Sequence, residues 1–410
     1  MNLVYERCCG LDIHKKTIAA CRITPGPDGT PQKVVKTFET MTDDVLALGK
    51  WLSEANVTHV AMESTGIYWQ PIYNLLEDEF SLLLVNARHV KAVPGRKTDV
   101  RDCEWLADLL RHGLLRASFV PDREQRQLRE LTRYRASLSD ERSAEVKRLQ
   151  KTLEASNIKL RSVASDILGK SGREMLDELA SGTTDVAELA NLAKGTLRTK
   201  IPALQRALDG RFGEHQRFMV ARHLAHIDFL DAEIEALDSE VATRTAPFKE
   251  QVATLDEIPG FGRRAAENVL AEIGTDMTRF PSSGHLASWA RLCPGSNESA
   301  GIQRSAPTGR GNPWLRRTLV QTAHATSRTR TYLGAQYQRL SRRRGSQKAT
   351  IAVAHTQLVV VYHLLRLPAL QFTDLGLDYF DRHDRVALKQ RHVRALEKLG
   401  YDVNLQSKAT

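Results

Sequence analysis

A run of 34 residues, 123–156, contains neither glycine nor proline, and its apolar residues recur at helical spacing. This pattern predicts one long helix over about residues 122–160. A second run, with an apolar residue at every third or fourth position, predicts another long helix over residues 216–244. Two long helices in one chain favour an antiparallel coiled coil, with a plain helical spacer as the alternative. Residues 161–215, between the two, are predicted to be helical but less regular.

The segment before the first long helix, residues 1–118, is predicted to be an α/β domain. The expected order is three strands, helix, strand, helix, strand, helix. Such an order suits a sheet that begins with antiparallel strands and continues with parallel ones. Short apolar runs occur at 4–13, 17–24, 34–37, 59–63 and 82–86, with helical patterns at 45–54 and 67–77.

The chain has 410 residues, which is too long for one ordinary core, so several domains are expected. After the α/β domain we predict a helical, coiled-coil region over residues 119–249. A mainly helical domain rich in glycine and arginine is predicted over residues 250–370. Residues 371–410 are predicted to be an extension, for which the sequence indicates no role. The predicted fold class is therefore α/β plus α.

Cysteine usage and hydropathy favour a cytoplasmic protein. The five cysteines are scattered and form no CxxC pair with a matching partner, which fits a reduced cytosolic protein better than a disulfide framework or a zinc site. No run of about 18 apolar residues occurs, so no membrane span is expected. The first residues also lack the basic and apolar regions of a signal peptide.

The distribution of charge indicates a polyanionic partner. The formal net charge is +10, and residues 299–373 contain twelve lysines or arginines but no aspartate or glutamate. A segment with one sign of charge needs a polyanionic partner or tolerates strong self-repulsion. Nucleic acid is the expected partner, and a solvated basic surface is the alternative.

Four carboxylates are candidates for a metal site. Asp12 lies at the end of the first apolar run, and Glu63 ends the fourth. Asp99 and Asp102 are three residues apart, which places both on one face of a helix. Oxygen ligands at several points around one cleft suit Mg²⁺ or Mn²⁺, and two such ions stabilise the attacking and leaving oxygens in phosphoryl transfer. Each acid alone would more often be a surface or capping residue, but together they have the layout of the ribonuclease-H-like nucleases, including the RuvC-type resolvases.

A glycine-rich turn in residues 255–274 is a candidate phosphate-binding element. The pattern predicts helix, tight turn and helix, with amide groups at the start of the second helix available to a phosphate. Arg263 and Arg264 add positive charge there. The segment resembles a helix-hairpin-helix, which binds the DNA backbone without regard to sequence. A helical corner without a ligand is the alternative.

Ser299 is a candidate nucleophile in a basic loop. A serine hydroxyl needs activation or stabilisation of the leaving group to attack phosphorus, and no histidine–aspartate partner is visible by spacing. A lone loop serine is usually solvated, so its surroundings decide the interpretation. Four nearby arginines could neutralise a phosphate in transit: Arg304, Arg310, Arg316 and Arg317.

Several motifs occur together in a fixed order. They include GLDIHK, MESTGIYW, KTDVRDCEWLADLL, IPGFGRRAAENVLAEIG and RGNPWLRRTLVQTA. On these motifs the chain resembles the transposases of insertion-sequence family 110, the DEDD transposases described as bridge-RNA-guided recombinases. The resemblance covers roughly residues 5–370.

The resemblance implies a RuvC-like domain, a coiled-coil insertion and a C-terminal transposase domain. It implies that Asp12, Glu63, Asp99 and Asp102 bind Mg²⁺ and that Ser299 attacks a backbone phosphate and becomes covalently linked to DNA. Implied partners are donor DNA, target DNA and a structured noncoding guide RNA, the bridge RNA, with a tetramer of two dimers as the assembly. The family pattern is Ser-Gly, whereas Ser299 is followed by Ala300 and then Gly301. The alternatives Ser296 and Ser305 therefore stay open.

Three functions are consistent with these observations. The first is RNA-guided excision and insertion of the protein's own DNA element, in a cytoplasmic protein that joins the nucleoid during activity. The second is a RuvC-like, metal-dependent nuclease that resolves DNA junctions with water as the nucleophile and does not need Ser299. The third is a noncatalytic nucleic-acid-binding protein, which the presence of all four acids argues against.

Overall fold

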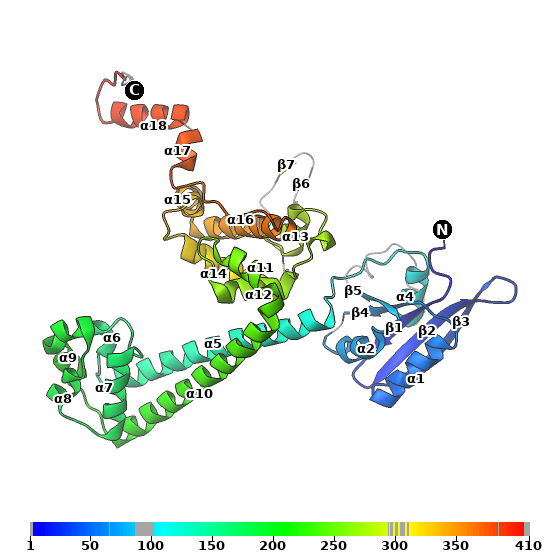
Figure 1. The fold of residues 1–410 in the computed structure, drawn as a ribbon, viewed down its shortest axis with the longest axis horizontal. Coiled ribbons are helices and arrows are strands. Elements are labelled where there is room, and N and C mark those ends of the chain that lie inside the picture. Colours follow the sequence, from blue (N-terminus) through cyan, green and yellow to red (C-terminus); the bar gives the residue numbers. More distant parts are fainter. Residues whose placement is uncertain are drawn as a thin grey trace. The chain divides into compact units, whose positions relative to one another are not determined.

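The computed structural model describes residues 3–64, 66–86, 102–293, 295, 298–299, 302–303, 308–309, 311–383 and 385–405. The chain divides into two compact units, Met1–Arg123 and Glu124–Thr410, which are described separately (Figure 1).

The first unit is built on a mixed five-stranded sheet with the order β3-β2-β1-β4-β5. Strand β2 pairs antiparallel with both β1 and β3, whereas β1, β4 and β5 are parallel to one another. The expectation of antiparallel strands followed by parallel ones is therefore confirmed. The strands are β1 (Cys8–Ile13), β2 (Thr17–Pro25), β3 (Pro31–Glu39), β4 (His59–Glu63) and β5 (Ser81–Val85).

Helices cover both faces of this sheet. Helices α1 (Thr42–Ser53) and α2 (Trp69–Leu76) pack on the face that carries Leu11 and Met62. Helix α4 (Asp102–Arg111) packs on the opposite face, against Cys8 and other small residues of the central strands. The two faces differ because successive side chains of a strand point to opposite sides.

The first strand is shorter than predicted. The apolar run at 4–13 suggested a strand from its beginning, but β1 starts only at Cys8. The backbone amides of Val4 and Tyr5 instead donate to the carbonyl of Arg111 at the end of α4, at 2.9 and 3.1 Å. The N-terminal residues therefore satisfy a helix end, where carbonyls lack intrahelical partners, and do not extend the sheet.

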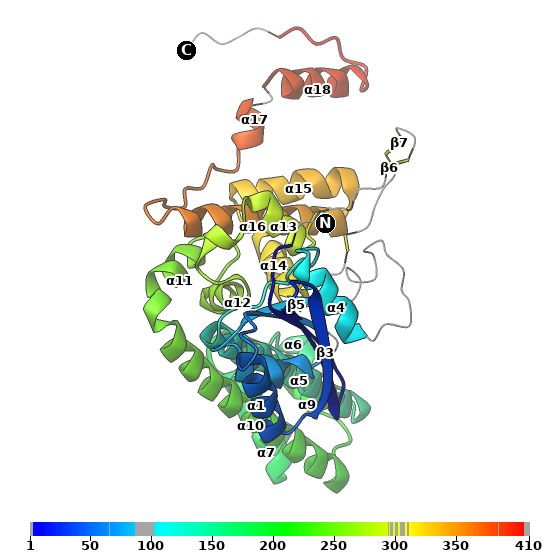
Figure 2. The ribbon, with the colours of Figure 1, turned by 90° about the vertical axis from the view of Figure 1, so that its right-hand side faces the viewer.

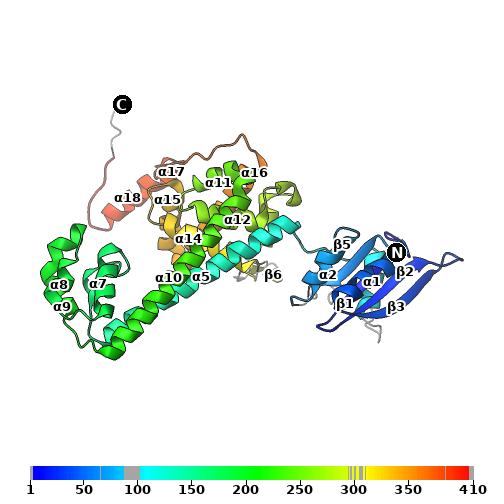
Figure 3. The same ribbon diagram turned by 60° about the horizontal axis from the view of Figure 1, so that its bottom comes forward.

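Two long helices begin the second unit, α5 (Arg123–Ala155) and α10 (Glu214–Thr245). They run side by side and antiparallel, with Leu138 of α5 buried against Leu230 and Ile234 of α10 (Figure 3). Both long helices predicted from the sequence are confirmed to within a few residues. Short helices between them share a core with the ends of the long pair: α6 (Leu160–Val163), α7 (Lys170–Ser181), α8 (Val186–Asn191), η1 (Gly195–Lys200) and α9 (Ile201–Leu208).

The helices that follow α10 share a larger core, in which α16 is the longest element. Figure 2 shows α15 alongside α16. By length and composition α16 is the one helix among the described residues that could cross a membrane, and 56% of its most apolar window is buried inside the protein. The helices of this core are α11 (Lys249–Asp256), α12 (Arg263–Ile273), α13 (Ser283–Trp289), α14 (Pro313–Thr326), α15 (Tyr332–Arg344) and α16 (Ser346–Arg366), with 3-10 turns at Ala246–Phe248 and Met277–Arg279.

Two features of this region were not predicted. A small hairpin, β6 (Glu298–Ser299) with β7 (Ile302–Gln303), lies where the sequence indicated only a loop. The C-terminal extension contains α17 (Tyr379–His383) and α18 (Arg385–Glu397). It contacts the preceding core through Phe380, whose ring stacks on Tyr332 of α15 at a centroid distance of 5.1 Å.

Candidate functional site

Two of the predicted carboxylates come from neighbouring parallel strands. The register of β1 and β4 pairs Gly10 with Ala61 and Leu11 with Met62. One step further along both strands come Asp12 and Glu63. The two acids therefore follow the last paired residues at the same edge of the sheet, the carboxyl end of its parallel strands.

Both acids also belong to the face that α4 covers. Side chains alternate along a strand, so Asp12 shares its face with Cys8, and Glu63 shares its face with Ala61. Cys8 and Ala61 are packed against α4. The electrostatics agree, because burial raises the pKa of Cys103 in α4 and the charges of Glu104 and Asp12 raise it further.

Close packing of α4 on β1 depends on Gly10. A Cβ atom at this position would lie 2.3 Å from the carbonyl oxygen of Cys103 and 2.5 Å from the amide nitrogen of Ala107. No side chain fits in that space. The glycine therefore lets the helix backbone approach the strand, and it brings the start of α4 toward the edge that carries Asp12.

Of the other two predicted metal ligands, the structure describes Asp102 but not Asp99. Asp102 is the first residue of α4 and is exposed, whereas Asp99 lies outside the described residues. Within the described ranges, no three His, Cys, Asp or Glu side chains are close enough together to hold a metal ion. The donor chemistry nevertheless suits a hard divalent cation, because the candidate ligands are carboxylates and the Asp12 side chain is 28% exposed.

Two other polar residues of the first unit have defined partners. The Nε2 atom of His14 lies 3.2 Å from Oδ2 of Asp12. Asp108 of α4 forms an ion pair with Lys33 of β3. Asp108 is thus engaged in holding α4 against the sheet.

The predicted glycine-rich hairpin is present in the second unit as α11, a tight turn and α12. Gly260 has a φ of +85°, and a Cβ there would lie 2.3 Å from the carbonyl oxygen of Thr322. The turn therefore packs directly on α14 and tolerates no side chain at this position. Gly262 precedes α12, whose first turn contains no acidic residue.

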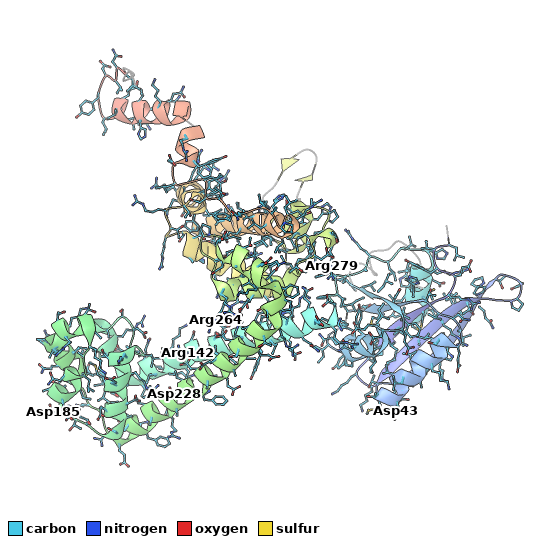
Figure 4. The ribbon with its side chains drawn as sticks, in the orientation of Figure 1. Asp43, Arg142, Asp185, Asp228, Arg264 and Arg279 are labelled. Atoms are coloured by element: carbon cyan, nitrogen blue, oxygen red, sulfur yellow. The ribbon has the colours of Figure 1, made fainter. Side chains whose placement is uncertain are left out.

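Arg263 and Arg264 at this turn already have carboxylate partners in the chain. Nε of Arg263 lies 2.8 Å from Oε1 of Glu267. Arg264, labelled in Figure 4, forms an ion pair with Asp238 of α10. Both arginine side chains are exposed, at 63% and 60%. They can therefore reach a phosphate, in competition with these ion pairs.

A buried ionic network joins α5 to α12, and no sequence pattern predicted it. Arg135 donates to Oε2 of Glu267 at 2.7 Å and to Oδ1 of Asp238 at 2.9 Å. Glu272 accepts two hydrogen bonds from Arg133, at 2.7 and 2.8 Å, and one from Asn312 at 2.6 Å. The partners in the arginine–carboxylate pairs are more than a hundred residues apart in the chain, so no local pattern could indicate them.

A cavity of about 310 Å³ lies beside this network and is lined by α5, α12 and α14. Its arginines include Arg133, Arg135, Arg264 and Arg317. Each of the four forms an ion pair with an acid of the same chain; that of Arg317 is with Asp140 of α5. The charge of this cavity is therefore largely balanced from within the protein.

Ser299 lies in the β6–β7 hairpin, where it pairs with Ile302 across an antiparallel bridge. The predicted neighbours Arg304 and Arg310, and the alternative serines Ser296 and Ser305, lie outside the described residues. Arg316 is on α14 and donates to the carbonyl oxygen of Arg291 at 3.1 Å.

A larger cavity, of about 1190 Å³, lies among α14, α15 and α16. We call it the α14–α16 cavity. Cys293 and Thr308, which flank the segment that bears Ser299, both line it. Of its lining residues, only Arg316 was singled out from the sequence. Most of the lining falls within the acid-free stretch at 299–373, which was the signal that could have found the cavity.

Comparison with known proteins agrees with this layout. Residues 9–158 match the family model of DEDD transposases of the IS110 type, and residues 252–338 match that of the transposase IS116/IS110/IS902 family. Together the matched regions take in more than half of the chain. A Streptomyces coelicolor protein described as the insertion element IS110 uncharacterized 43.6 kDa protein is 34% identical over 119 residues. That alignment spans 27% of this chain and 28% of the relative's length. The chain therefore belongs to the IS110 family of transposases.

Proposed function

We propose that the protein is the transposase of an insertion sequence and catalyses excision and insertion of its own DNA element by RNA-guided strand exchange. In this proposal the first unit is a RuvC-like, ribonuclease-H-like domain, the long helix pair is a coiled coil, and the helices after residue 250 form the transposase domain that carries the nucleophile.

The placement of Asp12 and Glu63 is the observation that carries this proposal. They lie at the same end of adjacent parallel strands, on the face covered by the helix that begins at Asp102. Two acids that are far apart in the sequence thus lie at one edge and on one face of the sheet, and a third begins the helix that covers this face. Such convergence is expected of a metal-dependent nuclease core and has no role in holding the sheet together.

Asp12, Glu63, Asp99 and Asp102 would hold the metal, for which Mg²⁺ is the proposed ion and Mn²⁺ the alternative. A bound divalent ion supplies charge stabilisation to oxygens on phosphorus during phosphoryl transfer. The half-buried position of Asp12 and Glu63 limits water around that charge and strengthens their attraction for a cation.

Ser299 is the proposed nucleophile. Its hydroxyl oxygen forms a bond to a backbone phosphorus, the bond from that phosphorus to a sugar oxygen breaks, and the proton lost by the serine is balanced by one gained by the departing hydroxyl. Support comes from its hairpin position within the acid-free basic stretch, where a phosphate is attracted. Arg304, Arg310, Arg316 and Arg317 are the proposed phosphate contacts near the serine, with Arg263 and Arg264 at the helical hairpin.

The proposed partners are donor DNA, target DNA and a structured guide RNA that selects sites by base pairing. The excess of positive charge suits backbone contacts with both nucleic acids. We further propose a tetramer of two dimers and a cytoplasmic location, at the nucleoid during activity. Under this proposal residues 1–118, 119–249 and 250–370 act as catalytic domain, spacer and transposase domain.

Strand exchange by two variants tests the proposal. Purified protein would be supplied with Mg²⁺, RNA transcribed from the flanks of the element, and donor and target duplexes. We expect Asp12→Asn and Ser299→Ala each to reduce exchange below detection, while Ser299→Ala still binds metal. If Ser299→Ala keeps cutting DNA at the wild-type rate, the protein is a water-dependent, junction-resolving nuclease. If Asp12→Asn retains full exchange, the metal site is wrongly assigned.

A further inference from the structure

The charged residues described around the α14–α16 cavity are all cationic. The lining includes Arg316, Arg343, Arg344 and Lys348, and it has no aspartate or glutamate among the residues that the structure describes. Its volume of about 1190 Å³ exceeds the ~300–1,000 Å³ usual for small-ligand sites. The space is therefore large enough for a nucleotide, and the charged side chains described around it are cationic.

Three cations of this cavity also differ from the arginines that line the smaller cavity. Arg264 and Arg317, at the smaller cavity, have carboxylate partners in the chain. Within the described part of the protein, no ion pair involves Arg343, Arg344 or Lys348, and all three side chains are exposed. Positive charge that the fold does not balance is available to an anion.

A glutamine in the same cavity has an acceptor without a donor. Thr356 donates its hydroxyl proton to the carbonyl of Ala352 at 3.1 Å and therefore accepts the 3.0 Å hydrogen bond from Nε2 of Gln336. This arrangement fixes the orientation of the carboxamide. Its Oε1 atom is buried and has no hydrogen-bond partner among the described residues. Buried polar atoms are almost always paired, so a missing donor points to a ligand.

The remaining polar groups of the cavity suit the same ligand. Burial lowers the pKa of His355, so its ring is neutral at pH 7 and can donate or accept a hydrogen bond. Ser346 and Gln347, in the first turn of the long helix α16, also line the cavity. The backbone amides of such a turn favour an anion.

We propose that the α14–α16 cavity holds one unstacked nucleotide of a single strand, with its phosphate against Arg343, Arg344 and Lys348 and a base N–H group donating to Oε1 of Gln336. The proposal rests on the proposed function, because it places the nucleotide beside the strand that Ser299 attacks. Cys293, which lines the cavity, is six residues from Ser299, a span of at most about 21 Å when extended. A strand bound at the serine therefore passes within reach of the cavity.

Binding of short single strands, without metal, tests this inference independently of catalysis. The full-length Ser299→Ala protein would be titrated with a DNA oligonucleotide and an RNA oligonucleotide of the same sequence at several salt concentrations. In this Ser299→Ala background, the cavity variant would carry both Arg343→Ala and Arg344→Ala. The matched control would carry both Arg342→Ala and Arg339→Ala, because these two exposed side chains do not line the cavity. Losing two phosphate contacts should reduce the slope of log affinity against log salt by about 1.4.

The base contact needs its own readout. A 2-aminopurine, scanned through the oligonucleotide, becomes brighter when unstacked, and we expect a rise at one position only. Gln336→Met, which keeps the length of the side chain but removes the acceptor, should lower the affinity about 5- to 10-fold for that base and leave the salt slope unchanged.

The outcomes separate this inference from the proposed function. A smaller salt slope in the cavity variant but not in the control supports the nucleotide site. Tighter binding of the DNA or of the RNA oligonucleotide then shows which strand supplies the nucleotide. Equal slope changes in both, or no brightening at any position, overturn the inference even if strand exchange occurs. Conversely, the site stands if it binds a single strand in a protein that exchanges none.

Discussion

Asp12 occupies an internal position of β1 between two buried residues, where a carboxylate is unfavourable unless it is paired or binds a cation. Its one described ionic neighbour close by is His14, whose side chain is largely exposed. This environment keeps the acid accessible from the edge of the sheet. An acid with a purely structural role would instead be expected to have a cationic partner, as Asp108 has Lys33.

The first prediction compares these two acids. Asp12→Asn removes one negative ligand and should weaken Mg²⁺ binding at least 10-fold, as measured by calorimetry on the full chain. Asp108→Asn is the matched control on the same face, because it removes a charge that is already paired with Lys33. Equal weakening in both variants would show that Mg²⁺ responds to net charge alone, and not to a site at Asp12.

Gly10 allows the second prediction. In Gly10→Ala the new methyl group would overlap the backbone of α4 at Cys103, so the helix must move away from β1. We expect a loss of about 1–3 kcal/mol of unfolding free energy. Hydrogen exchange in peptides from β1 and α4 should become faster in proportion.

The control for this substitution is Gly284→Ala in α13. Its new methyl group would meet nothing closer than 3.6 Å, the hydroxyl oxygen of Ser282. Alanine at an unstrained helical position is neutral or stabilising, by about 0.4–1 kcal/mol. If Gly10→Ala exchanged no faster than the wild type, the close approach of α4 to the strand would be wrong.

At the scale of elements, local patterns were enough to predict the long helices but not what joins them to the rest. Residues 123–156 lack helix-breaking residues, and the predicted helix corresponds to α5. The helical spacing does not distinguish the buried arginines of this helix from its exposed ones. Arg135 is in fact 3% exposed and paired with Glu267 of α12, a contact that only the tertiary fold creates.

The third prediction measures this buried pair. Arg135→Met leaves Glu267 without its main partner in a buried setting and should reduce the unfolding free energy of the second unit by about 3–5 kcal/mol. Adding Glu267→Met should restore most of that loss, because both charges are then gone. Urea denaturation of the single and double variants measures the coupling free energy between Arg135 and Glu267.

An exposed pair provides the comparison. Arg244 and Glu240 form an ion pair on α10, with side chains 39% and 46% exposed. Arg244→Ala should change the unfolding free energy by less than about 1 kcal/mol. An Arg135→Met effect as small as this one would mean that the network does not hold α5 to α12.

The fourth prediction concerns pH. Burial raises the pKa of Glu145, but hydrogen bonds from His223 and Arg148 outweigh it and hold that pKa below its ordinary value of 4.5. The carboxylate therefore stabilises the α5–α10 pair above about pH 4.5, and the contribution is lost as pH falls through the lowered pKa. In a plot of unfolding free energy against pH, Glu145→Gln should therefore reduce the fall in stability at acid pH. An unchanged fall in stability at acid pH would mean that other carboxylates cause it.

At the scale of the whole molecule, what the sequence predicted well was local or periodic. The ends of two apolar runs pointed to Asp12 and Glu63, and parallel pairing of β1 with β4 brings both to the same edge of the sheet. The hairpin at Ser299 was missed because strands of two residues have no periodicity to detect. The α14–α16 cavity was missed because its lining comes from three helices whose packing no single segment specifies.

The central claim is that acids of the first unit and Ser299 serve one reaction, in which the protein becomes linked to DNA. It is tested most directly by trapping that link. The wild-type protein, with Mg²⁺, the RNA from the element's flanks and end-labelled donor and target duplexes, would be run on a denaturing gel. The adduct would then be digested and sequenced by mass spectrometry. The account predicts an adduct at Ser299 that is absent from Asp12→Asn and from reactions without RNA. Cut DNA with no adduct, or an adduct at another residue such as Ser296 or Ser305, would contradict it.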